Sequence, residues 1–146
     1  MSQSRSANTP TLRVSRTFSA SRERVFAAWT DPQQLKTWWG PHGFTTPSAE
    51  IDLRVGGGFR LAMRSPDGKS ILLTGTYREV SPPTRLVYTW QFEGSEITLV
   101  TVEFNDRGNA TEVVLTHEKF ASEEARASHQ QGWGGCLDRL ADFVRA

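Results

Sequence analysis

The chain has 146 residues, of which 17 are basic and 16 acidic, so its net charge at pH 7 is +1. This near balance gives no electrostatic case for a nucleic acid or an anionic membrane as partner, because both require a clustered basic surface. A single cysteine excludes an intramolecular disulfide, and the length suits one domain that buries about 70% of the surface of its unfolded chain.

The first ten residues are polar and lack the apolar stretch of a secretory signal. We expect a disordered tail over residues 1–10, followed by one domain over residues 11–146. Elsewhere no uninterrupted apolar run approaches the ~20 residues that span a bilayer. The protein is therefore expected to be soluble and cytoplasmic, with no membrane partner.

The first elements expected are a strand and a short helix. Residues 12–18 alternate between apolar and polar side chains, which predicts a strand. Ser21 then offers a helix cap, and Val25, Phe26 and Trp29 follow at the three- and four-residue spacing of one helical face.

A second short helix is expected directly after the first. Asp31 suits the capping position, Pro32 the first helical position, and Gln34 lies three residues after the cap. The Gly40-Pro41 pair should end this helix.

Trp38 and Trp39 stand at the junction between that helix and the following strands. Tryptophan buries more apolar surface than a connecting segment normally offers. The pair is expected either to plug the core or to close the mouth of a cavity. The function depends on whether a cavity lies beneath it.

Residues 46–119 are predicted to form six antiparallel strands, because turn-forming residues interrupt them at the spacing of a meander. Alternation is clearest over residues 86–92, 98–104 and 111–117, which gives the sheet one apolar face. The glycines at 56–58 are interpreted as a turn or bulge, since no Lys-Ser or Lys-Thr pair follows as in a phosphate loop.

The apolar face must be covered, and a helix from about Ser122 to Val144 is the only long candidate. It contains the run Gly132-Trp133-Gly134-Gly135, in which each glycine costs about 1 kcal/mol relative to alanine. We expect the glycines either to admit close approach of a strand or of the tryptophan pair, or to leave room for a ligand beside Trp133.

Seven segments, in this order, resemble those of a known family: 19–26, 29–32, 35–41, 57–60, 75–80, 83–90 and 132–140. The family is the START-like, or SRPBCC, superfamily, in the branch named after the C-terminal domain of the activator of the heat-shock chaperone ATPase. The resemblance covers essentially residues 11–145. It implies an α+β helix-grip fold, in which a curved antiparallel sheet of about seven strands grips a long C-terminal helix, with two short helices after the first strand.

The resemblance also implies a hydrophobic cavity between sheet and helix, which relatives use for lipids, polyketides or other apolar small molecules. The strand alternation and the helical spacing independently allow such a cavity, whose wall would be mostly apolar with a few polar groups. The candidate ligand-binding residues are Trp39, Met63, Tyr77, Trp90, Val102, His117, His129, Trp133 and Cys136.

Catalysis is not favoured by the reactive side chains. Cys136 and His129 share a helix face, but seven residues separate them by about 10 Å along the axis. His117 could serve Cys136 as a base, yet a buried thiol beside glycines is more often a packing residue. The three histidines lack the spacing of a zinc site. We expect no catalytic residue, no metal and no cofactor.

Three functions remain open. The first is noncatalytic binding of an apolar small molecule, such as a lipid, a polyketide or an aromatic compound. The second is a stress-related, co-chaperone-like interaction module that contacts the heat-shock chaperone, although the eukaryotic activators have a further N-terminal domain for which this chain lacks the length. The third is a cyclase or hydrolase that uses the same cavity. The protein is expected to be a monomer or a homodimer.

Overall fold

Residues 10–145 are described by the computed structural model of the chain, and they form seven strands and three helices. Nine of the ten residues of the expected tail lie outside this range. The elements are β1 (Leu12–Phe18), α1 (Arg22–Thr30), α2 (Pro32–Trp38), β2 (Thr45–Ile51), β3 (Gly58–Arg64), β4 (Ser70–Ser81), β5 (Arg85–Phe92), β6 (Thr98–Asp106), β7 (Thr111–Glu118) and α3 (Glu123–Arg145).

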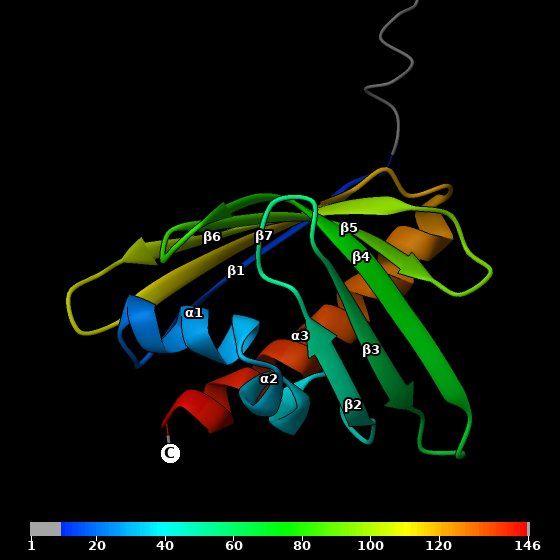
Figure 1. Cartoon of the computed structure of the whole chain (residues 1–146), viewed down its shortest axis with the longest axis horizontal. Coiled ribbons are helices and arrows are strands. Elements are labelled where there is room, and N and C mark those ends of the chain that lie inside the picture. The colour runs from blue at the N-terminus through cyan, green and yellow to red at the C-terminus, as the bar shows by residue number, and fades with distance from the viewer. Residues whose placement is uncertain (1–9, 146) are drawn as a thin grey trace, which may run out of the picture.

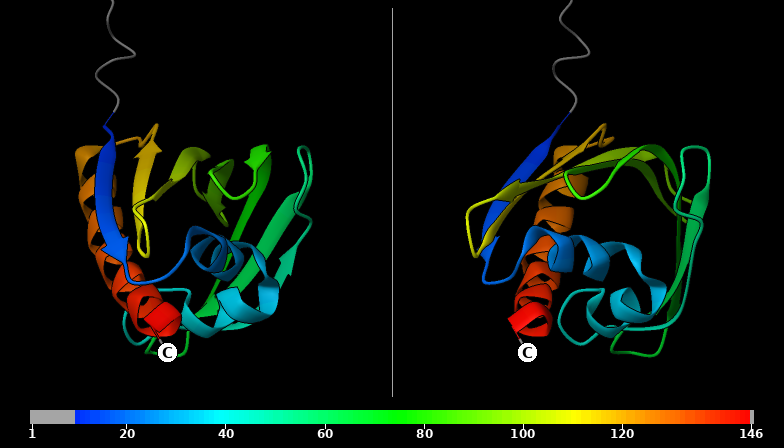
Figure 2. Two further views of the ribbon diagram at one scale, coloured as in Figure 1. Left: turned by 90° about the vertical axis from the view of Figure 1, so that its left-hand side faces the viewer. Right: turned by 60° about the vertical axis from the view of Figure 1, so that its left-hand side comes forward.

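All seven strands belong to one antiparallel sheet with the order β1-β7-β6-β5-β4-β3-β2. The sheet is therefore a six-strand meander to which β1 is added beside β7. It curves strongly, and α3 runs across its concave side (Figure 1). The two short helices lie on that same side, next to the C-terminal half of α3 (Figure 2). The expected α+β helix-grip fold is confirmed.

The two short helices begin at the expected caps. The hydroxyl of Ser21 accepts a hydrogen bond from the backbone N–H three residues later, at 3.2 Å. A carboxylate oxygen of Asp31 accepts from the backbone N–H of Gln33 at 3.0 Å. The side chain of Gln34 departs from a capping box, since its amide donates to the Asp31 carboxylate instead of accepting from the Asp31 backbone.

The alternating strands bury their apolar face against α3, because period-two spacing places every second side chain on the concave side of the sheet. The helix contributes residues spaced three and four apart to the same core. The buried residues of β5, β6, β7 and α3 include Leu86, Tyr88, Trp90, Val100, Val102, Phe104, Val113, Leu115, Trp133, Cys136, Leu137, Leu140 and Val144.

Gly56 and Gly57 lie in the connection between β2 and β3, as expected for a turn, and Gly58 is the first residue of β3. Gly56 has a φ of +86°, and the N–H of Gly57 donates to the carbonyl of Arg54 at 2.8 Å. The register of β4 against β5 shifts between Tyr77 and Glu79, which marks a bulge.

No helix within residues 10–145 is both long enough and apolar enough to cross a membrane.

Candidate functional site

A cavity of about 180 Å³ lies between α3, the strands β3 to β5, and the segment that follows α2. Its wall is largely aromatic and aliphatic, and none of the residues that border it is an aspartate, glutamate, lysine or arginine. They are Trp39, Gly40, Pro41, Phe44, Met63, Ile71, Trp90, Phe92, Ser128, His129, Gly132, Trp133 and Cys136.

Strand pairing and helical spacing explain why residues of β3, β4 and α3 lie together on this wall. Met63 of β3 pairs directly with Ile71 of β4, so the two side chains lie on one face of the sheet. On α3 a stripe with four-residue spacing runs through Ser128, Gly132 and Cys136. The middle position of that stripe has no side chain, which leaves space beside the helix.

Trp38 and Trp39 have different roles. The Trp38 indole is 1% exposed, and its N–H donates to the carbonyl of Ala28 at 3.0 Å, so this residue plugs the core. Trp39, the C-cap residue of α2, borders the cavity. The core-plug interpretation therefore applies to Trp38, while Trp39 lies on the wall of the cavity.

Three indole rings form a connected cluster on the cavity wall. The ring centroids lie 5.9 Å apart for Trp39 and Trp90, 5.5 Å for Trp39 and Trp133, and 5.2 Å for Trp90 and Trp133. These separations lie in the range in which aromatic rings attract one another. The cluster joins the segment after α2 to β5 and α3.

His117 lies behind this cluster and links two of its members by hydrogen bonds. The N–H of Trp133 donates to Nδ1 of His117 at 3.1 Å, while Nε2 of His117 lies 2.7 Å from the hydroxyl of Thr98. That hydroxyl donates to the carbonyl of Trp90 at 3.1 Å. These partners assign the proton of a neutral imidazole to Nε2.

Burial lowers the pKa of His117 from 6.5 to about 3, and the electrostatic interaction with nearby His129 acts in the same direction. Burial also raises the pKa of the Cys136 thiol, to about 12. At neutral pH the thiol is therefore protonated, and both ring nitrogens of His117 are engaged in hydrogen bonds. This arrangement does not supply an activated nucleophile and its base.

One guanidinium group fixes the segment after α2 on the helix. Nη1 of Arg139 lies 3.0 to 3.2 Å from the carbonyl oxygens of Trp39, Gly40, Pro41 and Phe44. All four acceptors belong to residues that border the cavity. Arg139 therefore holds this part of the wall in place.

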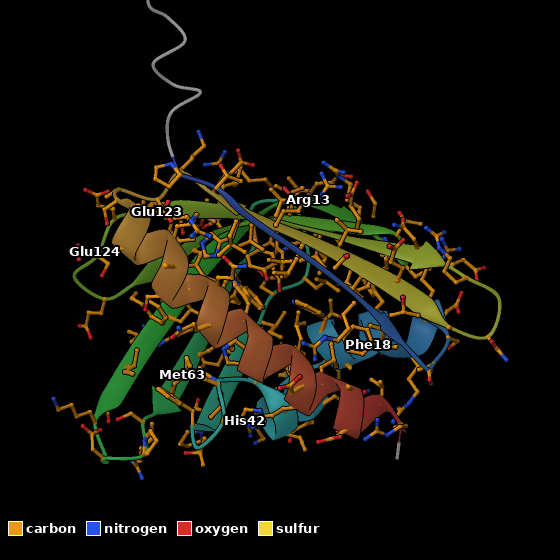
Figure 3. The ribbon with its side chains drawn as sticks, turned by 180° about the vertical axis from the view of Figure 1, so that it is seen from behind. Arg13, Phe18, His42, Met63, Glu123 and Glu124 are labelled. Atoms are coloured by element: carbon orange, nitrogen blue, oxygen red, sulfur yellow. The ribbon has the colours of Figure 1, made fainter. Side chains whose placement is uncertain are left out.

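A second set of contacts joins the same segment to α3 at the surface. Asp138 forms an ion pair with Arg16 of β1, and its other oxygen lies 3.1 Å from Nε2 of His42. Figure 3 shows His42 beside α3 and Met63 on a strand behind the helix. Gly135 permits this approach, since a Cβ there would lie 3.2 Å from the backbone nitrogen of His42.

Within residues 10–145, no group of three or more His, Cys, Asp or Glu side chains is arranged to hold a metal ion.

The cavity brings together six of the nine candidate residues. Those that border it are Trp39, Met63, Trp90, His129, Trp133 and Cys136. Tyr77 instead borders a second hollow of about 20 Å³ on the other side of Trp39. Val102 and His117 are fully buried and border neither space.

Seven residues of the wall were not among the sequence candidates, although the glycine run that includes Gly132 was expected to leave room for a ligand as one of two possibilities. They are Gly40, Pro41, Phe44, Ile71, Phe92, Ser128 and Gly132. Phe92 could have been found because it shares the alternating face of Trp90. Gly132 and Ser128 lie one and two helical turns before Cys136. Phe44 carries no such signal, because it lies in an irregular segment.

A curved antiparallel sheet that grips a long helix, with an aromatic cavity between the two, defines a helix-grip protein of the START-like class. The chain belongs to the family described as "Activator of Hsp90 ATPase homolog 1-like protein", which it matches over residues 19–145. A comparison with curated proteins gives no significant match.

Solved structures with this fold come from several bacteria. Protein CV1439 from Chromobacterium violaceum is 28% identical with a TM-score of 0.83, and the match covers 94% of this chain and 99% of that one. The AHSA1 protein SPO3351 from Silicibacter pomeroyi is 26% identical with a TM-score of 0.81, over 91% and 96%. An AHSA1-like protein from Aeromonas hydrophila is 28% identical with a TM-score of 0.75, over 92% of each chain.

Proposed function

We propose that the protein binds a small apolar molecule in the cavity between the sheet and α3, without catalysing a reaction. The observation that carries this proposal is the space of about 180 Å³ behind a wall without acidic side chains, lysine or arginine. A concave, mostly apolar site with a few polar groups is the usual form of a small-molecule site. The six candidate residues that border the space are proposed as ligand contacts.

The volume restricts the size of the ligand. An apolar cavity of ~150 Å³ binds benzene, so a space of about 180 Å³ suits a single aromatic ring with a short substituent. A long acyl chain or a polyketide with several rings exceeds this volume. Among the ligands considered from the sequence, the volume therefore favours the small aromatic class.

Calorimetric titration with ethylbenzene tests the proposal, together with the tryptophan emission of the protein. We expect binding with a change in emission, because three indoles border the cavity. Ile71→Trp enlarges a wall residue and should abolish binding, whereas Ile97→Trp makes the same change at a position that is 58% exposed and should not. Absence of binding to the unaltered protein would refute the proposal.

Membership of the family supports a second proposal, in which the chain contacts a chaperone of the Hsp90 class in the cytoplasm during stress. A pull-down with that chaperone, followed by an ATPase assay, separates this function from ligand binding. A protein that binds ethylbenzene but leaves the chaperone ATPase unchanged has only the first function.

A further inference from the structure

We infer that the indole of Trp39 sets the upper size of the ligand, because it divides the apolar space over strands β3 to β5 into two hollows. This inference rests on the proposed function, since it names the residue that decides which molecules the same site accepts. A shorter side chain at position 39 converts a site for one aromatic ring into a site for two linked rings.

Trp39 borders two apolar hollows. One is the cavity of about 180 Å³, and the other is the second hollow of about 20 Å³. Among the described residues, Trp39 alone borders both spaces. The other residues around the second hollow are apolar or aromatic, and they are Trp29, Leu35, Ile51, Phe59, Leu61, Tyr77 and Tyr88. A ligand that extended from the cavity into the second hollow would therefore meet no charged side chain.

The ring contacts of Trp39 place its indole at the boundary between the two spaces. Its ring centroid lies 5.9 Å from that of Trp90 and 5.5 Å from that of Trp133, which both border the cavity. It also lies 6.5 Å from the ring centroid of Trp29, which borders the second hollow. The side chain of Trp39, and not only its backbone, therefore contacts the walls of both spaces.

The same face of the sheet forms the floor of both spaces. In β3, Phe59, Leu61 and Met63 occupy alternate buried positions; the first two border the second hollow and Met63 borders the cavity. In β5, Tyr88 borders the second hollow, and Trp90 two residues later borders the cavity. Because alternate residues of a strand lie on one face, the two hollows follow one another along the same strands.

The backbone of Trp39 is anchored independently of its side chain. Its N–H donates to the carbonyl of Leu35 at 2.9 Å, and its carbonyl accepts from the hydroxyl of Thr46 at 3.0 Å and from Nη1 of Arg139 at 3.2 Å. Nε1 of the indole has no hydrogen-bond partner among the described residues, so shortening the side chain removes no hydrogen bond. A smaller residue therefore keeps the backbone contacts of this segment while it opens the boundary.

Two ligands of different length test the inference. Ethylbenzene suits the cavity alone, whereas biphenyl carries a second ring that needs the adjoining hollow. In the unaltered protein we expect ethylbenzene to bind more tightly than biphenyl. In Trp39→Ala the affinity for biphenyl relative to that for ethylbenzene should rise about tenfold, because the second ring is then buried from water. Calorimetric titration with both ligands gives this ratio within each variant, so a general change in the cavity affects both measurements.

Methyl resonances show where each ligand lies. Ile71 borders the cavity and not the second hollow, and Leu61 borders the second hollow and not the cavity. In ¹H–¹³C spectra of the unaltered protein, ethylbenzene should shift the methyl resonances of Ile71 and leave those of Leu61 unchanged. In Trp39→Ala, biphenyl should shift both.

Phe92→Ala is the matched control, and Trp39→Leu is a milder second variant. Phe92 is a half-buried aromatic residue that borders the cavity but not the second hollow, so its removal enlarges the site away from the boundary. Biphenyl in Phe92→Ala should therefore leave the resonances of Leu61 unchanged. Trp39→Leu removes less volume than Trp39→Ala, so it should raise the biphenyl ratio in the same direction but by less.

Each outcome separates this inference from the proposed function. If the unaltered protein binds ethylbenzene but the ratio does not rise in the Trp39 variants, or Leu61 does not respond in them, the size limit is refuted while the binding function stands. If the protein and its variants bind neither ligand, both are refuted. Biphenyl that binds the unaltered protein as tightly as ethylbenzene and shifts Leu61 refutes the boundary without any substitution, so the test still decides if a variant fails to fold.

Discussion

The indole nitrogen of Trp133 lies 3.1 Å from Nδ1 of His117, and this hydrogen bond joins α3 to β7 inside the core. Through Thr98 the same imidazole is linked to the backbone of Trp90, so two wall residues of the cavity share one buried support. The bond requires an acceptor at Nδ1, which only the neutral form of the ring provides here. The position of the cavity wall is therefore tied to the protonation state of His117.

Replacing His117 with phenylalanine should destabilise the protein by about 2 kcal/mol. The new ring fills a similar volume, but the buried N–H of Trp133 then has no acceptor, and an unsatisfied buried donor costs about 1–3 kcal/mol. Urea unfolding measures the change. His129→Phe is the matched control, because His129 is only half-buried and donates within its own helix to Ala125.

A double-mutant cycle isolates the hydrogen bond itself. In Trp133→Phe the donor is already absent, so adding His117→Phe should cost about 1 kcal/mol less than it does in the unaltered protein. Strict additivity of the two changes would contradict the role assigned to this bond.

Stability should fall as the pH decreases from 7 to 5. The pKa of His117 is lowered from 6.5 to about 3, so the unfolded chain takes up a proton that the folded protein excludes. The free energy of unfolding is not reduced by this effect above about pH 6.5, and it falls as the pH decreases from there towards 3. Within that window each pH unit lowers the free energy of unfolding by at most about 1.4 kcal/mol. The expected loss between pH 7 and pH 5 is therefore about 2 kcal/mol.

Urea unfolding at several pH values checks this dependence. Asp67, Glu123 and Asp138 also have lowered pKa values, but these carboxylates begin from 3.8 to 4.5 and act mainly below pH 5. The slope between pH 7 and pH 5 should disappear in His117→Phe and persist in His42→Gln. A slope that is unchanged in His117→Phe would show that another group is responsible.

The fold could be predicted because local signals agree with the tertiary structure. Alternation over residues 98–104 gives a strand with one buried face. The Asp31-Pro32 pair starts a helix, because the Asp31 side chain accepts a hydrogen bond from a backbone N–H of the first turn. The order of the elements follows from such signals along the chain, and this order resembles that of the family. Both alternation and capping depend on residues that are close in the sequence.

The site could be predicted only in part, because its wall depends on long-range packing. Periodicity identifies Trp90 and Trp133 as buried residues, but it does not reveal that one indole N–H has an acceptor and the other does not. Phe44 borders the cavity because Arg139 holds an irregular segment on α3, ninety-five positions away in the sequence. Val102 faces the core as expected, but neighbouring side chains fill the space in front of it.

Arg139→Met should loosen the segment of residues 39–44 and destabilise the fold by about 2 kcal/mol. Methionine keeps an apolar stem but cannot donate to the four carbonyls, and hydrogen bonds from a charged group contribute about 1.5–3 kcal/mol. Amide hydrogen exchange should become faster at residues 40–44, and affinity for ethylbenzene should decrease.

Arg107→Met is the matched control for that change. Arg107 pairs with Glu112 on an exposed part of β7, where an ion pair contributes about 0–1 kcal/mol. The control should leave both the exchange of residues 40–44 and ligand affinity unaltered. Equal effects of the two substitutions would remove the specific role of Arg139.

The neighbouring glycines Gly134 and Gly135 should respond in opposite ways to alanine. A Cβ at Gly134 meets no atom within 4 Å, so Gly134→Ala should stabilise α3 by up to about 1 kcal/mol. At Gly135 the added carbon would lie 3.2 Å from the backbone nitrogen of His42, so the gain in helix propensity is offset by displacement of that segment.

Gly132 provides the third comparison, because its Cβ would make an ordinary contact of 3.7 Å with Pro41 and yet enter the cavity wall. Gly132→Ala should therefore keep the gain in stability while weakening the binding of ethylbenzene. Urea unfolding and calorimetry on the three alanine variants distinguish these cases, since only Gly135→Ala should move the resonances of His42. If Gly135→Ala stabilises the protein as much as Gly134→Ala, close approach to the segment is not the reason for glycine there.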